Sequence, residues 1–313
     1  MRTRWTGCGT ALVTPFTRDG AIDEPAIRRL ARRQIDAGIH FLVPCGTTGE
    51  SPTLSADERR RVVELVVAEA ASAKGSGAGS GEGAAVPVLA GAGGYDTREV
   101  IEAVHAMERA GAQGILSVTP YYNKPTQDGL FQHYRAIADS TTLPIIVYNV
   151  PGRTGCNVEP ATIARLAAIA NIVGVKEASG NMMQIADVCA RVPPDFLVLS
   201  GDDGMTLPVM AVGGRGVISV AGNEVPGEMS RMVEAAERGD WQAARALHAR
   251  LWPLMTINFV ESNPMPVKAA MAKMGLLDEV YRLPMVSPRD ESRLRIEQVL
   301  RDLDLVAHAG AAR

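Results

Sequence analysis

The feature that most constrains the fold is an alternation of short apolar runs with longer helical patterns. The runs are rich in β-branched residues, which is typical of buried strands. Roughly eight runs precede residue 240, which is the number of strands that closes a (β/α)8 TIM barrel. We therefore predict such an α/β barrel over residues 1–239. The runs are centred on residues 10–13, 40–45, 87–90, 114–118, 144–148, 172–176, 196–200 and 216–220.

The helical pattern is clearest at residues 56–73, where Ser55 and Glu58 have the Ser-x-x-Glu spacing of a capping box. After residue 239 the alternation stops, and only helical patterns follow. We predict that residues 240–313 form a C-terminal helical domain. Its apolar faces could pack on the barrel or serve an oligomer interface, and the sequence leaves both open. The predicted helices cover residues 241–259, 266–275 and 289–305.

Three glycine-rich stretches, at residues 75–83, 91–94 and 213–216, raise the question of a nucleotide site. A glycine loop that binds phosphate needs a strand before it and a helix after it. The first and third stretches precede a strand, and the second lacks the dinucleotide spacing. We interpret residues 75–83 as a flexible insertion away from the site, and we predict no nucleotide cofactor.

The composition of the 313 residues is that of an ordinary globular protein, with 46% hydrophobic residues and a formal net charge of -3. This charge gives no reason to expect nucleic acid or a membrane as a partner. No apolar run approaches a membrane span, and the first residues lack a secretory signal, so we expect a cytoplasmic protein. The four cysteines and five histidines are scattered, which argues against a disulfide framework or a metal site.

Lys176 is the strongest candidate for a catalytic residue. It ends the short apolar run at residues 172–176, so it should lie at the carboxyl end of a buried strand. Desolvation there would lower the pKa of the ammonium and favour the neutral amine, which can attack a carbonyl. The competing interpretation is a structural ion pair with an acid such as Glu177.

Polar residues follow five of the predicted strands, and the active site of a TIM barrel lies at those strand ends. Taken singly, threonine pairs are usually turns or caps, tyrosine pairs are usually packing, and an arginine is usually a surface ion pair. Together they supply an amine, phenols and two anion anchors, which suits Schiff-base chemistry on a small keto acid. The residues are Thr47 and Thr48, Tyr121 and Tyr122, Tyr148 and Arg153, Lys176, and the stretch Ser200–Asp203.

These motifs resemble those of the dihydrodipicolinate synthase and N-acetylneuraminate lyase family of class I pyruvate aldolases. The similarity covers the loop at residues 46–51, the spacing from Tyr148 to Lys176, and the motif at residues 263–268. The stretches at residues 119–125 and 148–155 are most similar to the dihydrodipicolinate synthase branch. Sugar-acid lyases generally lack the arginine that Arg153 matches.

The resemblance implies a role for each matching residue. Lys176 would form an imine with pyruvate, and Tyr148 would move protons, linked to solvent through Thr48 and Tyr122. Tyr122 would reach in from a neighbouring subunit of a homotetramer built from dimers. Thr47 and Thr48 would bind the pyruvate carboxylate, and Arg153 the carboxylate of L-aspartate 4-semialdehyde. Gly201 and Ile218 would line the pocket, and no cofactor is implied.

Two further expectations follow from the resemblance. Ser51, Glu99 and Tyr121 match a cleft that binds lysine in inhibited members, but in the same cleft Tyr95 replaces an asparagine and Arg59 stands where such members often carry a histidine. We therefore predict weak or absent inhibition by lysine. The alternatives for the activity are a related aldolase acting on a sugar or aromatic keto acid, and a catalytically inactive binding paralogue.

Overall fold

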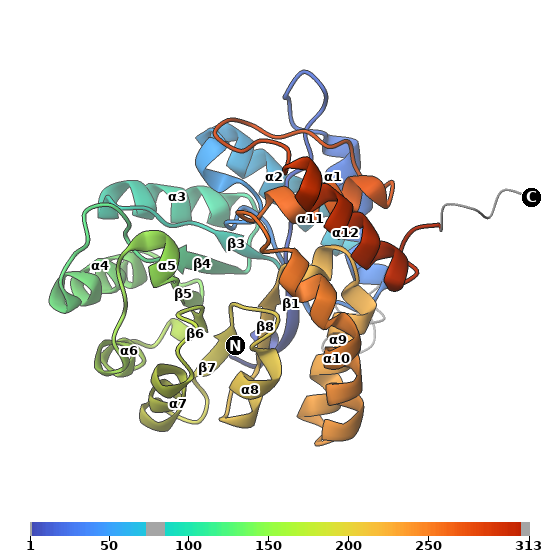
Figure 1. Cartoon of the computed structure of the whole chain (residues 1–313). Coiled ribbons are helices and arrows are strands. Elements are labelled where there is room, and N and C mark those ends of the chain that lie inside the picture. Colours follow the sequence, from blue (N-terminus) through green and yellow to red (C-terminus); the bar gives the residue numbers. More distant parts are fainter. Residues whose placement is uncertain (1, 73–84, 308–313) are drawn as a thin grey trace, which may run out of the picture.

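A computed structural model describes residues 2–72 and 85–307 of the chain (Figure 1). Eight parallel strands form one sheet in the order β2-β1-β8-β7-β6-β5-β4-β3. A parallel bridge between Leu42 of β2 and Val88, the residue before β3, closes the barrel between the two edge strands. The predicted TIM barrel is therefore confirmed. The strands are β1 (Gly7–Ala11), β2 (Phe41–Val43), β3 (Leu89–Gly91), β4 (Gly114–Val118), β5 (Ile145–Asn149), β6 (Ile172–Glu177), β7 (Leu197–Ser200) and β8 (Gly216–Ser219).

Helices surround the strands and extend past them at the C-terminal end. Those that follow the strands are α1 (Glu24–Asp36), α2 (Ala56–Ser72), α3 (Thr97–Arg109), α4 (Gln127–Asp139), α5 (Pro151–Thr154), α6 (Pro160–Leu166), α7 (Met182–Arg191), α8 (Thr206–Ala211) and α9 (Pro226–Glu237). The tail contains α10 (Trp241–Ile257), α11 (Met265–Lys273) and α12 (Asp290–Asp302). The three tail helices were predicted to within three residues at each end.

Alternating side chains divide the core into two layers. Inward-facing residues such as Ile146, Leu116 and Leu199 fill the barrel, while Ile145 and Val147 pack outward against the helices. Trp5 lies in the barrel interior, where its ring meets Phe41 edge to face with 5.8 Å between centroids. The barrel interior is thus a packed core, so a ligand is expected at a barrel mouth rather than inside the barrel.

The predicted capping box at the start of α2 is present. The Ser55 hydroxyl accepts a hydrogen bond from the Glu58 amide at 3.2 Å, and the Glu58 carboxylate accepts one from the Ser55 amide at 2.8 Å. Helix α2 buries Val62, Val63 and Val66 against the barrel. The glycine-rich residues 75–83 lie outside the described residues.

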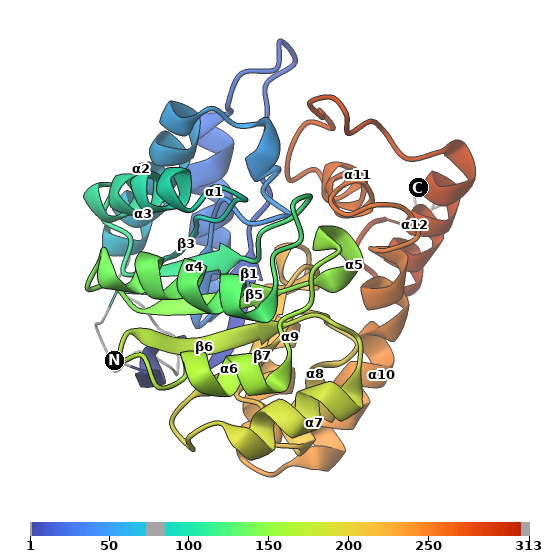
Figure 2. The same ribbon diagram turned by 90° about the vertical axis from the view of Figure 1, so that its left-hand side faces the viewer.

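The C-terminal helices pack on one another and on the barrel. Helix α10 contacts α8 and α9, while α12 contacts α10 and α11. Figure 2 shows α11 on the same side of the barrel as α5, the helix that follows β5. The tail therefore reaches the carboxyl ends of the strands. Within the described ranges, no helix has the length and apolar character needed to cross a membrane.

Candidate active site

The strand register turns Lys176 into the barrel. Lys176 pairs with Tyr148 on β5 and with Leu199 on β7, and both neighbours belong to the interior core. Side chains at the same register position of adjacent strands point to the same face. The Lys176 side chain is only 5% exposed, and its Nζ lies 4.2 Å from the centre of the Tyr148 ring.

Glu177 does not pair with Lys176. As the next residue on the strand, it points to the opposite face, where its carboxylate accepts hydrogen bonds from the Asn149 side chain at 3.0 Å and the Ser179 amide at 2.8 Å. Lys176 makes no ion pair with any residue in the described ranges. The structural ion pair considered from the sequence is therefore wrong.

Gly201 makes room for the Lys176 side chain. A Cβ atom at Gly201 would lie 3.1 Å from Lys176 Cε and 2.6 Å from the Ala178 Cβ. Real Cβ contacts are rarely so short, so a larger residue would displace the lysine. Ile218 is fully buried in the interior core, beside β1.

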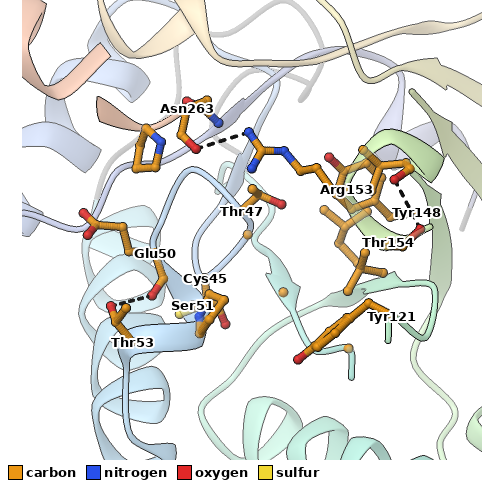
Figure 3. Close-up of a pocket in the computed structure, with 18 of the residues that line it drawn as sticks. Cys45, Thr47, Glu50, Ser51, Thr53, Tyr121, Tyr148, Arg153, Thr154 and Asn263 are labelled. Carbon is orange, nitrogen blue, oxygen red and sulfur yellow. Dashed lines mark hydrogen bonds between the residues drawn. The ribbon is translucent and has the colours of Figure 1, made fainter. Parts of the chain in front are cut away.

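A cavity of about 380 Å³ opens at the carboxyl ends of the strands (Figure 3). Its wall includes Thr47, Tyr121, Tyr148 and Arg153 among the predicted site residues. Lys176, Thr48, Gly201 and Ile218 are not part of this wall. Tyr148 connects the two sets because its ring lines the cavity and also contacts the lysine amine. The wall is completed by Cys45, Gly46, Glu50–Thr53, Arg59, Gly91–Gly93, Leu116, Val118, Val150, Thr154, Asn263, Pro264, Pro284 and Met285.

The threonine loop, residues 46–50, follows β2 and is held by buried contacts. The Thr48 hydroxyl accepts a hydrogen bond from Asn263 Nδ2 at 3.0 Å. Glu50 adopts a left-handed conformation with φ 52°, and its carboxylate pairs with Lys268 Nζ at 2.6 Å. Burial lowers the pKa of the Lys268 ammonium, while the Glu50 charge opposes this shift.

Arg153 supplies a positive charge at the cavity wall. It lies in α5, whose Pro151 favours a helix start at this position. Its guanidinium Nη2 donates to the Asn263 carbonyl oxygen at 3.2 Å, as Figure 3 shows. No described carboxylate forms an ion pair with it. The guanidinium is therefore free to bind an anion in the cavity.

The predicted tyrosines have different environments. Tyr121 lines the cavity and packs edge to face on Tyr95, with 5.2 Å between the ring centroids. Burial raises the pKa of the Tyr121 phenol. Tyr122, in contrast, is 89% exposed and has a φ of 70°. Ser51 lines the cavity, while Glu99 lies exposed in the first turn of α3.

Comparison with known proteins identifies the family. A model described as the Dihydrodipicolinate synthetase family matches residues 4–303. The chain belongs to this family. A relative from Koribacter versatilis, named 4-hydroxy-tetrahydrodipicolinate synthase, is 50% identical over 307 residues, covering 98% of each chain.

Two solved structures of dihydrodipicolinate synthases have the same fold. That of the chloride-inhibited enzyme from Acinetobacter baumannii complexed with pyruvate is 39% identical, with a TM-score of 0.91, covering 96% of this chain and 99% of that chain. That from Cyanidioschyzon merolae with lysine bound is 37% identical, with a TM-score of 0.91, covering 97% of this chain and 99% of that chain.

Asn263, Glu50 and Lys268 were not assigned a role from the sequence, although their motifs supported the family resemblance. All three contact the threonine loop or belong to it. Glu50 and Lys268 are far apart in the sequence, so a role for them can be recognised only once the folded structure shows that they form a buried ion pair. The motif at residues 263–268 was visible, but its contact with Thr48 was not.

Proposed function

We propose that this chain is a 4-hydroxy-tetrahydrodipicolinate synthase, which condenses pyruvate with L-aspartate 4-semialdehyde through a Schiff base on Lys176. The observation that carries the proposal is the buried Lys176 amine over the Tyr148 ring, without an acid partner in the described part of the chain. An amine in this setting is held for reaction, whereas a structural lysine would be paired.

The proposed reaction begins when the Lys176 amine attacks the pyruvate carbonyl carbon. A proton delivered to the carbinolamine hydroxyl lets it leave as water and gives a protonated imine, and loss of a methyl proton converts the imine into an enamine. The enamine carbon adds to the aldehyde, whose oxygen takes up a proton. The amine of the adduct then displaces Lys176 by transimination, which closes the ring and regenerates the free lysine.

Tyr148 is the proposed proton carrier for these steps. Its position beside Lys176 places a phenol next to the atoms that gain and lose protons. Thr48 and the Tyr122 of a neighbouring subunit would link it to solvent. The exposure of Tyr122 supports this arrangement because the ring is available to another chain.

Thr47 and Thr48 are proposed to bind the pyruvate carboxylate, and Arg153 the carboxylate of the aldehyde. Arg153 also favours this activity over the related aldolases that act on sugar or aromatic keto acids. Its unpaired guanidinium at the cavity wall offers a second carboxylate a charge-assisted hydrogen bond.

Trapping with pyruvate and borohydride tests the chemistry. Mass analysis should find one reduced pyruvate adduct on Lys176 in the wild type and none in Lys176→Ala. A wild type that forms no adduct would refute the Schiff-base mechanism. A panel of aldehydes then tests specificity, and L-aspartate 4-semialdehyde should react much faster than sugar aldehydes.

Arg153→Ala separates the two substrates. It should reduce kcat/KM for the semialdehyde by roughly 100-fold, since a charge-assisted hydrogen bond to a carboxylate is lost. Adduct formation with pyruvate should change much less. Comparable losses in both measurements would mean that Arg153 has a structural role.

We further propose a homotetramer built from dimers and a cytoplasmic location. The exposed Tyr122 supports a subunit contact. The thiols of Cys8, Cys45, Cys156 and Cys189 are free, which fits a reducing compartment.

A further inference from the structure

Asn263 contacts both predicted anion anchors from the C-terminal segment. It is buried in the connection between α10 and α11. Its side-chain Nδ2 donates to the Thr48 hydroxyl at 3.0 Å, and its backbone carbonyl accepts from Arg153 Nη2 at 3.2 Å. One residue of the tail therefore bridges side chains that follow β2 and β5.

The direction of the contact with Thr48 has a chemical consequence. The Thr48 oxygen accepts the amide hydrogen, so the hydroxyl hydrogen remains available to a second acceptor. A carboxylate has only acceptors when it is ionised. Asn263 thus orients Thr48 as a donor toward an anionic ligand.

Lys268 fixes the same loop at its other end. Its Nζ lies 2.6 Å from Glu50 Oε1 and donates to the Thr14 carbonyl at 3.1 Å, and both ionic side chains are almost fully buried. The Thr14 hydroxyl in turn donates to the Gly49 carbonyl at 2.7 Å. The loop is therefore held by the barrel at Gly49 and by the tail at Thr48 and Glu50.

Stability alone does not explain a buried ion pair at this position. Desolvation of two charges offsets most of their attraction, and apolar replacements of such pairs are often neutral or stabilising. What the pair does provide is a fixed geometry, because the ammonium has only this carboxylate and one carbonyl as hydrogen-bond acceptors among the described residues.

We propose that Asn263 and Lys268 are positioning residues that hold the threonine loop in the conformation that binds the pyruvate carboxylate. The inference rests on the proposed function, since it assigns pyruvate to this loop. It makes the C-terminal segment part of the active site. It also gives Asn263 two roles. The side chain orients the Thr48 hydroxyl, and the backbone carbonyl accepts a hydrogen bond from Arg153.

Two substitutions at Asn263 test the side-chain role. Asn263→Ala removes the donor but keeps the carbonyl, so the pyruvate concentration for half-maximal borohydride trapping should rise roughly three- to tenfold, the worth of one hydrogen bond. Asn263→Asp has the same shape but can only accept, so it captures the Thr48 hydrogen and repels the substrate. It should raise this concentration further. The KM for the semialdehyde should change little in Asn263→Ala.

The Lys268 contact needs a paired substitution because Lys268→Met alone leaves the Glu50 charge buried without a partner. The double variant Glu50→Gln and Lys268→Met removes both charges, and it should fold while raising the half-saturating pyruvate concentration. Asn258→Ala is the matched control. Asn258 is a buried asparagine of the same segment whose side chain donates to Glu224 at 2.5 Å, so its loss should lower the melting temperature without changing pyruvate saturation.

The outcomes separate the inference from the proposed function. A wild type that traps pyruvate, with unchanged saturation in Asn263→Ala, Asn263→Asp and the double variant, would overturn the inference and leave the proposed function intact. Equal changes in the KM of both substrates in Asn263→Ala would also overturn it, since they indicate a general structural defect. A wild type without an adduct would overturn the proposed function, and this inference with it.

Discussion

At the scale of single residues, Arg59 places a guanidinium at the cavity wall. Its side chain lines the cavity beside Ser51 and Tyr121, and Nη1 approaches the Ser51 carbonyl at 3.5 Å. No described acid forms an ion pair with it. A guanidinium here repels the ammonium groups of free lysine.

We therefore predict that lysine inhibits this protein weakly or not at all. Condensation activity should be measured in a lysine titration, and half-maximal inhibition at sub-millimolar lysine would contradict the prediction. Arg59→His should lower the inhibitory concentration because it removes a permanent charge. Arg60→His is the control, since Arg60 pairs with Glu64 on the exposed face of α2 and should leave inhibition unchanged.

The site residues show what a sequence can and cannot predict. Lys176 was predicted because a lysine that ends a β-branched run is locally unusual, and its burial is confirmed. Asn263 was not, because its partner Thr48 lies 215 residues away and nothing local indicates the contact. The ion-pair alternative for Lys176 failed for a geometric reason: successive residues of a strand face opposite ways.

At the scale of elements, the contact between α3 and α4 contains a buried histidine. His133 of α4 shares a hydrogen bond of 2.9 Å between its Nδ1 and the Thr97 hydroxyl at the start of α3. Its Nε2 has no hydrogen-bond partner among the described residues. Burial lowers the pKa of His133 to about 4 from an ordinary value of 6.5.

This shift predicts a loss of stability in mild acid. Between pH 6.5 and about 4 the unfolded chain binds a proton that the folded chain does not, so stability falls as the pH falls through this window. The full shift is worth about 3 kcal/mol. Melting temperatures of His133→Gln should therefore fall less between pH 6.5 and 4.5 than those of the wild type. Some slope should remain, because burial also lowers the pKa of His40; identical slopes would contradict the assignment.

Element type was easier to predict than element boundaries. The eight strands and the tail helices follow from periodicity, but the sequence predicts the first strand at residues 10–13, whereas β1 covers Gly7–Ala11. Leu12 and Val13 continue the apolar pattern because they are buried beyond the sheet. Gly7 and Gly9 have no side chain, which leaves space for neighbouring side chains. A Cβ at Gly9 would lie 2.1 Å from the Phe41 ring.

At the scale of the whole molecule, the tail cannot be treated as a separate appendage. Asn263, Pro264, Pro284 and Met285 contribute to the cavity wall. The boundary that we propose between residues 239 and 240 therefore separates secondary-structure patterns rather than functions. Contacts across more than two hundred residues depend on the closed barrel, so local patterning could not predict them.

In the proposed enzyme, Tyr122 makes a dimer the minimal functional unit. The ring is exposed in the single chain, and its backbone φ of 70° is rare for an aromatic residue. If it completes the site of a neighbouring subunit, Lys176→Ala and Tyr122→Phe should each be nearly inactive alone. Each active site would then take its Lys176 from one chain and its Tyr122 from the other.

Mixing the two variants provides the decisive measurement. After dissociation and reassembly, half of the dimers should contain one chain of each kind, and one of their two sites combines an intact Lys176 with an intact Tyr122. The mixture should therefore recover about a quarter of the wild-type activity, as expected for two equivalent sites in a symmetric dimer. Mixing Lys176→Ala with Tyr148→Phe is the control, because Tyr148 and Lys176 belong to the same site within one chain. Little recovery is expected there, since the mixed dimer has one site without the lysine and one without the phenol. Equal recovery in both mixtures, or none in either, would place Tyr122 outside the neighbouring site.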